Sequence, residues 1–161
     1  MYYVVIWNYD NWSNWYYSYF GTNETAAIWN FETEVLNCFQ YGADDVTAIM
    51  LVGLKSLKDD EIELLINKLN NCNNQVFIHD FTRTEANKVE QLFQNGDEIY
   101  YDGPADYYWE IFNQVQNGRL ELPLTPKKLS KIFNLNNIDL LETIDYNDLN
   151  NDLQERLNEE D

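Results

Sequence analysis

Two short apolar runs on either side of an amphipathic segment constrain the fold of this chain more than any other feature. The first run, residues 46–52, is short, uncharged and rich in β-branched residues, which is typical of a buried strand. Residues 75–81 form the second run. The segment between them places apolar residues at helical spacing, namely Ile62, Leu65, Ile66 and Leu69. This order predicts a strand–helix–strand unit, whose two strands lie parallel in one sheet.

The same alternation of strand and helix continues along residues 1–118. Further strands are predicted at residues 2–7 and 98–101, and further helices at residues 23–41, 82–95 and 104–118. We therefore expect a mainly parallel four-stranded sheet flanked by helices, in a Rossmann-like or flavodoxin-like α/β domain. Residues 119–161 predict a helical, acidic C-terminal extension that packs on this domain.

Two helical segments within residues 125–144 are spaced like a helix-turn-helix. The segment in the position of a recognition helix carries Asp139 and Glu142, which would face phosphates and base edges. Helices that read DNA are basic, so we interpret these residues as a packed helical hairpin and not as a DNA reader.

The net charge limits the partners that this chain can bind. With 28 Asp and Glu against 10 Lys and Arg, the formal net charge is −18, and the only basic cluster is Lys127, Lys128 and Lys131. Lys and Arg are needed to neutralise phosphates, so direct nucleic-acid binding and binding to an anionic membrane are both disfavoured. The charge either serves solubility alone or matches a basic partner protein.

The chain is predicted to be a soluble protein of the cytoplasm, or of the host cytoplasm if a phage encodes it. No apolar run approaches the ~20 residues of a membrane span. The first basic residue is Lys55, so the N-terminus lacks the basic region of a signal peptide. Cys38 and Cys72 are then expected to be free, buried thiols in a reducing compartment.

Aromatic residues are concentrated near the N-terminus, where ten of the first twenty positions are Phe, Trp or Tyr. Acidic disordered chains are poor in aromatic residues, so this chain is expected to fold. Residues 8–21 mix aromatic side chains with Asn, Asp, Ser and Gly, which predicts a long loop. Tyr and Trp are favoured at protein interfaces. The candidate anchors for a partner are Trp12, Tyr16, Tyr17 and Tyr19, with burial at a sheet edge as the alternative.

No motif for a cofactor or a metal ion is present. The turn after the first predicted strand has neither the glycine pattern of dinucleotide-binding folds nor a P-loop, which argues against nucleotide binding of these two types. Cys38, Cys72 and His79 lack the paired spacing of a zinc site. We therefore predict no cofactor and no metal.

His79 is the only histidine and defines an alternative, enzymatic hypothesis. It lies near the predicted carboxyl end of a strand, where parallel α/β sheets bind ligands. Asp10 or Asp102 from neighbouring loops would orient the imidazole, and Arg83 would bind an anion. These residues describe a small-ligand-binding or hydrolytic site. A strand-end histidine bonded to backbone is the simpler interpretation, and we favour it.

Carboxylates on a folded scaffold support the functional hypothesis that we favour. The candidate partner-binding acids are Glu61, Glu63, Asp97, Glu98, Asp102, Asp106 and Glu110. Carboxylates at fixed spacing can imitate nucleic-acid phosphates and occupy a basic groove. The chain is then a non-enzymatic inhibitor of a nucleic-acid-handling protein: an anti-defence factor of a phage or mobile element, directed against a restriction enzyme or CRISPR-type effector, or the immunity protein of a nuclease toxin. A structural subunit with a solvating acidic surface is the remaining alternative.

Overall fold

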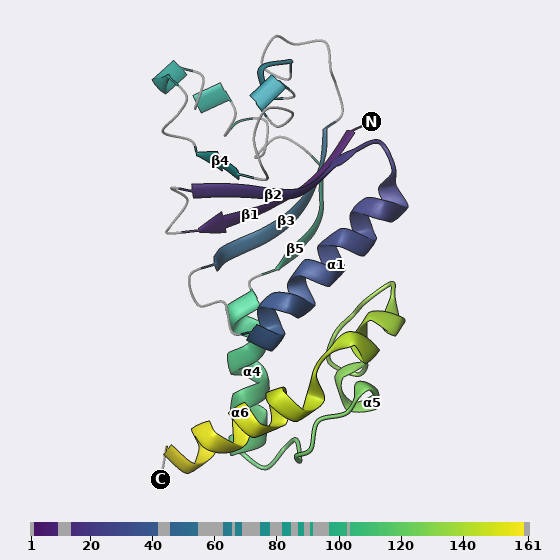
Figure 1. Ribbon diagram of the computed structural model, residues 1–161, viewed down its shortest axis with the longest axis vertical. Helices are drawn as coiled ribbons and strands as arrows, with labels where there is room; N and C mark the ends of the chain where they lie inside the picture. Colours follow the sequence, from purple (N-terminus) through teal and green to yellow (C-terminus); the bar gives the residue numbers. More distant parts are fainter. Residues whose placement is uncertain are drawn as a thin grey trace. The chain divides into compact units, whose positions relative to one another are not determined.

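Figure 1 shows a computed structural model of the chain, which describes residues 2–9, 14–41, 46–54, 63–65, 67–68, 75–77, 82–84, 87–88, 91, 97–102 and 104–159. For residues 75–77 and 97–102, and near the ends of some other elements, only the backbone is described. The chain divides into two compact units, Met1–Phe31 with Asp44–Gly103, and Glu32–Ala43 with Pro104–Asp161. Helix α1 (Glu24–Tyr41) contributes its first turns to the first unit and the rest to the second. A domain boundary after residue 118 stays a prediction.

The first unit is built on a five-stranded sheet in which every pairing between described strands is antiparallel. The strands are β1 (Tyr2–Tyr9), β2 (Asn14–Gly21), β3 (Val46–Leu54), β4 (Gln75–Phe77) and β5 (Asp97–Asp102). Their order across the sheet is β4-β2-β1-β3-β5. The long strands β2, β1 and β3 therefore lie side by side at its centre (Figure 1).

The predicted parallel, Rossmann-like sheet is wrong. Strands β3 and β4, the two apolar runs expected to be parallel neighbours, run in opposite directions and are separated by β1 and β2. The difference begins in the predicted loop at residues 8–21, because Asn14–Gly21 is strand β2. Its aromatic residues favour extended backbone. Only four residues separate β2 from β1, which is too short for a parallel crossover and leaves an antiparallel hairpin.

Strands β1 and β3 form the core of the first unit. Val4, Val5, Ile49 and Leu51 are fully buried. Neighbouring residues of a strand point to opposite faces, so both faces of the sheet are covered here. The first turns of α1 pack against one face (Figure 1), where Ala27 is fully buried. Uninterrupted apolar strands are typical of parallel sheets, which is why the apolar pattern alone predicts the wrong strand direction.

The described residues of the second unit form helices joined by turns and loops, without a strand. Besides residues 32–41 of α1, it contains α4 (Pro104–Gln116), α5 (Pro126–Leu129), the 3-10 helix η2 (Ile138–Thr143) and α6 (Tyr146–Glu159). Phe39 is fully buried in its core, and its ring meets that of Phe133 edge-on at a centroid distance of 5.2 Å. Residues 119–161 thus contain α5, η2 and α6, with turns and loop between them, while their role as an extension packed on residues 1–118 stays a prediction.

The segment considered for a helix-turn-helix folds as short helical pieces that contact each other, α5 and η2. The position of the recognition helix is occupied by the six-residue 3-10 helix, with Leu140 and Leu141 buried. The segment therefore packs as short helical pieces, while the expectation that it does not read DNA stays a prediction.

One buried carboxylate ties α1 to the segment before η2. Glu32 is 1% exposed. Its Oε1 accepts from the backbone N–H of Asn136 at 2.6 Å and from Nδ2 of the same residue at 3.2 Å. Its Oε2 accepts from the backbone N–H of Asn137 at 3.0 Å and from its Nδ2 at 2.7 Å. Both oxygens of the carboxylate are thus matched by N–H donors, as a buried polar group requires.

Two predicted helices are described only in part. The one at residues 62–69 is helical at 63–65 and 67–68, and the one at residues 82–95 is helical at 83–84, 87–88 and 91. Their other residues lie outside the described part of the chain. None of the described helices is both long and apolar enough to cross a membrane.

Candidate functional site

The alternative site around His79 lies mostly outside the described residues. His79 and Asp10 are not among them. Arg83 is exposed in a short helical segment, and Asp102 ends β5 with only its backbone described. The enzymatic hypothesis therefore stays a prediction. Among the residues that the structure does describe, no group of three or more His, Cys, Asp or Glu side chains could hold a metal ion.

The predicted partner-binding acids are only partly described. Trp12 and Glu61 lie outside the described residues. Backbone alone is described for Asp97, Glu98, Asp102 and Asp106. Glu63 and Glu110 are exposed, but they belong to different units. Whether the predicted acids form one surface therefore stays a prediction.

The predicted tyrosine anchors belong to strand β2 and not to a loop. Tyr16, Tyr17 and Tyr19 are half-buried there. The ring of Tyr16 lies 6.5 Å from that of Trp7, its partner across the sheet. The hydroxyl of Tyr19 accepts from the N–H of Asn23 at 3.1 Å or donates to its carbonyl at 3.2 Å. These contacts stabilise the sheet and its junction with α1, while a role in partner binding stays a prediction.

Helix α6 presents a continuous row of carboxylates. Asp148, Asp152, Glu155 and Glu159, which we call the acidic row, follow one another at intervals of four, three and four residues, and all are exposed. Residues at this spacing share one side of a helix. At about 1.5 Å of rise per residue, the row is roughly 16 Å long, with one carboxylate about every 5–6 Å. One strand of duplex DNA carries a phosphate about every 3.4 Å of axis, so the row has a lower charge density than such a strand.

A second row, made of amides, lies beside the first on α6. Its members each precede a residue of the acidic row and are exposed: Asn147, Asn151, Gln154 and Asn158. Gln154 donates from Nε2 to Oδ1 of Asn158 at 3.4 Å. The exposed side of α6 therefore offers carboxylate and amide oxygens, which are acceptors that match the N–H donors of Lys and Arg.

Contacts on the opposite side hold α6 in place. Leu149 and Leu153 are buried, with 1% and 0% of their surface exposed. Asn150 bonds to both backbone groups of Leu124: its Oδ1 accepts from the N–H at 2.7 Å, and its Nδ2 donates to the carbonyl at 3.2 Å. The acidic row is thus presented on a helix that is already fixed, so binding would not have to order it.

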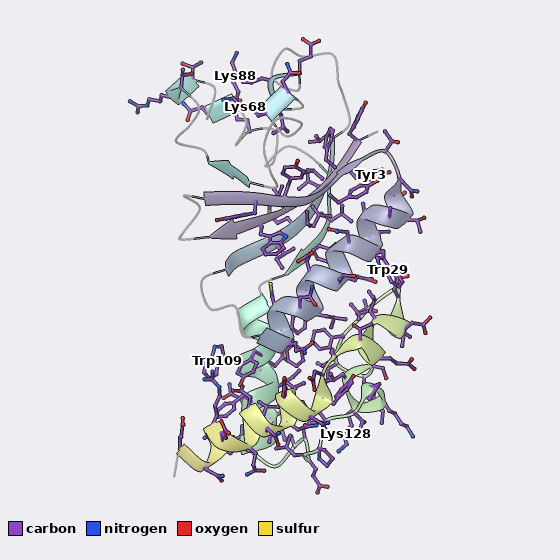
Figure 2. The ribbon with its side chains drawn as sticks, in the orientation of Figure 1. Tyr3, Trp29, Lys68, Lys88, Trp109 and Lys128 are labelled. Atoms are coloured by element: carbon purple, nitrogen blue, oxygen red, sulfur yellow. The ribbon has the colours of Figure 1, made fainter. Side chains whose placement is uncertain are left out.

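An exposed aromatic residue, Trp109, lies beside the acidic row, next to the buried Tyr108. Tyr108 donates its hydroxyl proton to Asp152 at 2.5 Å, and burial together with this bond raises the pKa of Tyr108 well above its usual range. The guanidinium carbon of Arg156 lies 5.2 Å from the ring centre of Tyr108 and 5.4 Å from that of Trp109, while its Nε is 3.4 Å from Asp152. Trp109, which is labelled in Figure 2, is 40% exposed. An Arg stacked on an exposed Trp is a typical composition of an interface hot spot.

The sequence contains a signal for the acidic row, but a count of charges does not find it. Along residues 148–159 the acids recur at intervals of three or four residues, and an amide precedes each of them. Helical periodicity, when it is applied to polar residues, therefore identifies the acidic row. Trp109 gives no comparable signal. Tyr108 and Trp109 are adjacent, and only packing decides that the first is buried and the second exposed.

Comparisons with protein-family models, with curated proteins and with solved structures found no match.

Cys38 is expected to be unreactive in the folded protein. It is a free thiol, as predicted, and burial, with a smaller contribution from Glu34, raises its pKa to about 12. Only the thiolate is nucleophilic, so at pH 8 the reactive fraction should be about a thousandfold smaller than that of an exposed cysteine. Treatment with iodoacetamide at pH 8, followed by mass spectrometry, should modify Cys38 only after denaturation. Rapid modification of the folded protein would show that the thiol is accessible and ionised.

Proposed function

We propose that this chain is a non-enzymatic inhibitor that binds a basic, nucleic-acid-handling protein in place of its nucleic acid. The acidic row of α6 is the observation that carries this proposal. A charged surface that served solubility alone would not require carboxylates at regular intervals on one side of a fixed helix. The net charge of −18 adds a long-range field that speeds association with a cationic groove.

Binding would follow the physics of protein–DNA association. The groove of a nuclease is lined with Lys and Arg, and the carboxylates of the acidic row would pair with them as phosphates do. The affinity should therefore fall steeply as the salt concentration rises. Trp109 would add an apolar contact that a phosphate backbone lacks, which helps to distinguish one basic partner from another.

The partner is expected among nucleases and nucleic-acid-binding effectors. A restriction enzyme or a CRISPR-type effector would make the chain an anti-defence factor of a phage or mobile element. A nuclease toxin would make it an immunity protein. In each case the chain would act in the cytoplasm, without binding nucleic acid itself and without a cofactor.

Displacement of DNA from purified nucleases tests this proposal. One restriction enzyme, one CRISPR-type effector and one nuclease toxin are each bound to fluorescently labelled DNA at low salt, and the chain is titrated into each complex. We expect displacement from at least one of them, measured by fluorescence anisotropy, and no binding of the chain to DNA alone. If no complex releases its DNA, the panel gives no support for mimicry and favours the solubility interpretation of the charge.

A further inference from the structure

Positive charge is concentrated in one segment of this acidic chain. Residues 119–131 hold four of the ten basic residues and a single acid, Glu121. The proposed inhibitor function does not use this segment, because a cationic surface repels a basic groove. The segment belongs entirely to the second unit.

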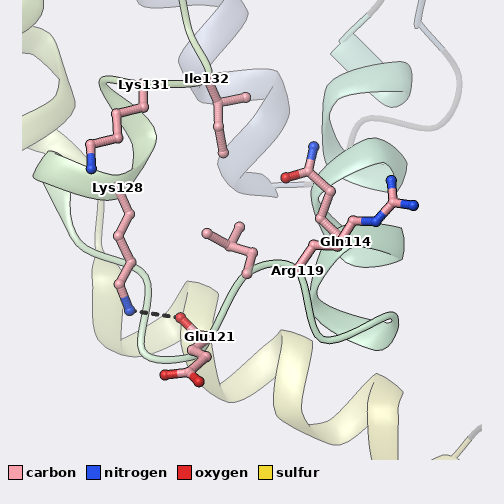
Figure 3. A pocket seen from close by; sticks show the side chains of 7 residues that line it. Gln114, Arg119, Glu121, Lys128, Lys131 and Ile132 are labelled. Atoms are coloured by element: carbon pink, nitrogen blue, oxygen red, sulfur yellow. Dashed lines mark hydrogen bonds between the residues drawn. The ribbon is translucent and has the colours of Figure 1, made fainter.

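Three of these four bases line a pocket of about 420 Å³ (Figure 3). The cationic members of its lining are Arg119, Lys128 and Lys131. Leu120 and Ile132 supply apolar surface, and Gln114 supplies an amide. A volume of this size lies within the range of small-molecule sites, which combine apolar walls with a few polar groups.

The end of helix α4 builds one wall of the pocket. Gly118 has a positive φ of 74°, which lets the chain leave the helix. The next two backbone N–H groups, of Arg119 and Leu120, then donate to the carbonyl of Gln114 at 2.8 and 3.1 Å. Arg119, Leu120 and Gln114 are thereby fixed together at the pocket.

Helix α5 and the connector before it build the opposite wall. The ammonium of Lys128 donates to the carbonyls of Glu121 and Pro123, at 2.7 and 2.9 Å. Figure 3 shows the Glu121 carboxylate turned away from Ile132 and Lys131. The contacts that the structure describes give neither Arg119 nor Lys131 a carboxylate partner, and both are exposed. Two cations that face solvent from different walls thus remain available to an anion.

We propose that this pocket binds a small organic phosphate, of the class of a nucleoside monophosphate. Three cations and one carboxylate give its lining a net charge of +2, which matches the charge of a phosphate monoester near neutral pH. The phosphate would lie at the cationic rim, and Arg119 would approach it with its planar fork of N–H donors. The organic ring would lie against Leu120 and Ile132. This inference does not depend on the proposed inhibitor function.

Calorimetric titration of the full chain tests the proposal, with adenosine 5′-monophosphate, adenosine and inorganic phosphate as probes at low salt. We expect saturable binding of the monophosphate. Binding should be at least tenfold weaker for adenosine, which lacks the phosphate, and for inorganic phosphate, which lacks the organic ring. Equal affinity for inorganic phosphate would overturn the assignment of an organic ligand. No saturable binding of the monophosphate would overturn the site itself.

A matched pair of variants locates the binding. Arg119→Gln and Lys131→Gln each remove an exposed cation from the pocket lining, and each should weaken binding of the monophosphate at least tenfold. Lys127→Gln removes the same charge from an exposed residue of α5 that does not line the pocket, and it should leave the affinity within about twofold. An equal loss in Lys127→Gln would show diffuse attraction to a basic surface and would overturn the pocket.

Discussion

Replacing Glu32 with glutamine should lower the free energy of unfolding by about 3 kcal/mol or more. One carboxylate oxygen becomes an NH₂ group, and this group faces the two N–H donors of either Asn136 or Asn137. Two charge-assisted hydrogen bonds are lost, and donors in a buried position are left without an acceptor. Urea unfolding followed by circular dichroism measures the effect as a lower midpoint, with an unchanged dependence on urea.

Glu34→Gln on the same helix is the matched control. Burial raises the pKa of the Glu34 carboxyl, so its folded pKa lies above its unfolded pKa. A group of this kind adds stability below the unfolded pKa and loses that contribution as the pH rises through the folded pKa. At pH 7 an uncharged amide should therefore leave stability unchanged or increase it. If Glu32→Gln is tolerated equally well, the four contacts of Glu32 do not hold α1 to the segment before η2.

Neutralising three members of the acidic row should weaken binding to the partner on the order of 100-fold at about 0.1 M salt. The variant combines Asp148→Asn, Glu155→Gln and Glu159→Gln. It keeps Asp152, which bonds to Tyr108 and Arg156, so the fold should be unaffected. The variant forms fewer ion pairs with the partner, so the slope of log affinity against log salt should also become shallower. Fluorescence anisotropy at several salt concentrations measures both quantities.

The control for this variant removes the same number of charges elsewhere. Glu24→Gln, Glu121→Gln and Asp139→Asn lie outside α6, and all three residues are exposed. Exposed charges away from an interface contribute little, so the affinity should fall by less than about threefold. Equal losses in the two triple variants would mean that the partner responds to net charge and not to the acidic row.

The positions of many elements could be predicted from the sequence, but their pairing could not. Apolar runs locate β1 and β3, and helical spacing locates α1 and α4, because burial requires apolar residues at regular positions along the sequence. The direction of a strand gives no such sequence pattern. It is set by the hairpin of β1 with β2, whose tyrosines alternate with polar residues too irregularly to be recognised as a strand.

For the candidate surface, too, some features could be predicted from sequence patterns and others depend on packing. The overall acidity predicts a basic partner, yet the candidate acids chosen from the middle of the chain, such as Glu63 and Glu110, belong to different units. The acidic row instead lies in the C-terminal segment, where helical periodicity of charged residues marks it. The exposure of Trp109 depends on how α4 packs against Arg156 of α6, and no local pattern predicts it.

The most direct test of mimicry compares two complexes of one nuclease, identified by DNA displacement. The affinity of that nuclease is measured for its DNA and for this chain over a series of salt concentrations. If the acidic row replaces phosphates, both affinities fall steeply with salt, and the two ligands exclude each other from one site. An affinity for this chain that does not change with salt, or a ternary complex in which DNA stays bound, would contradict the account.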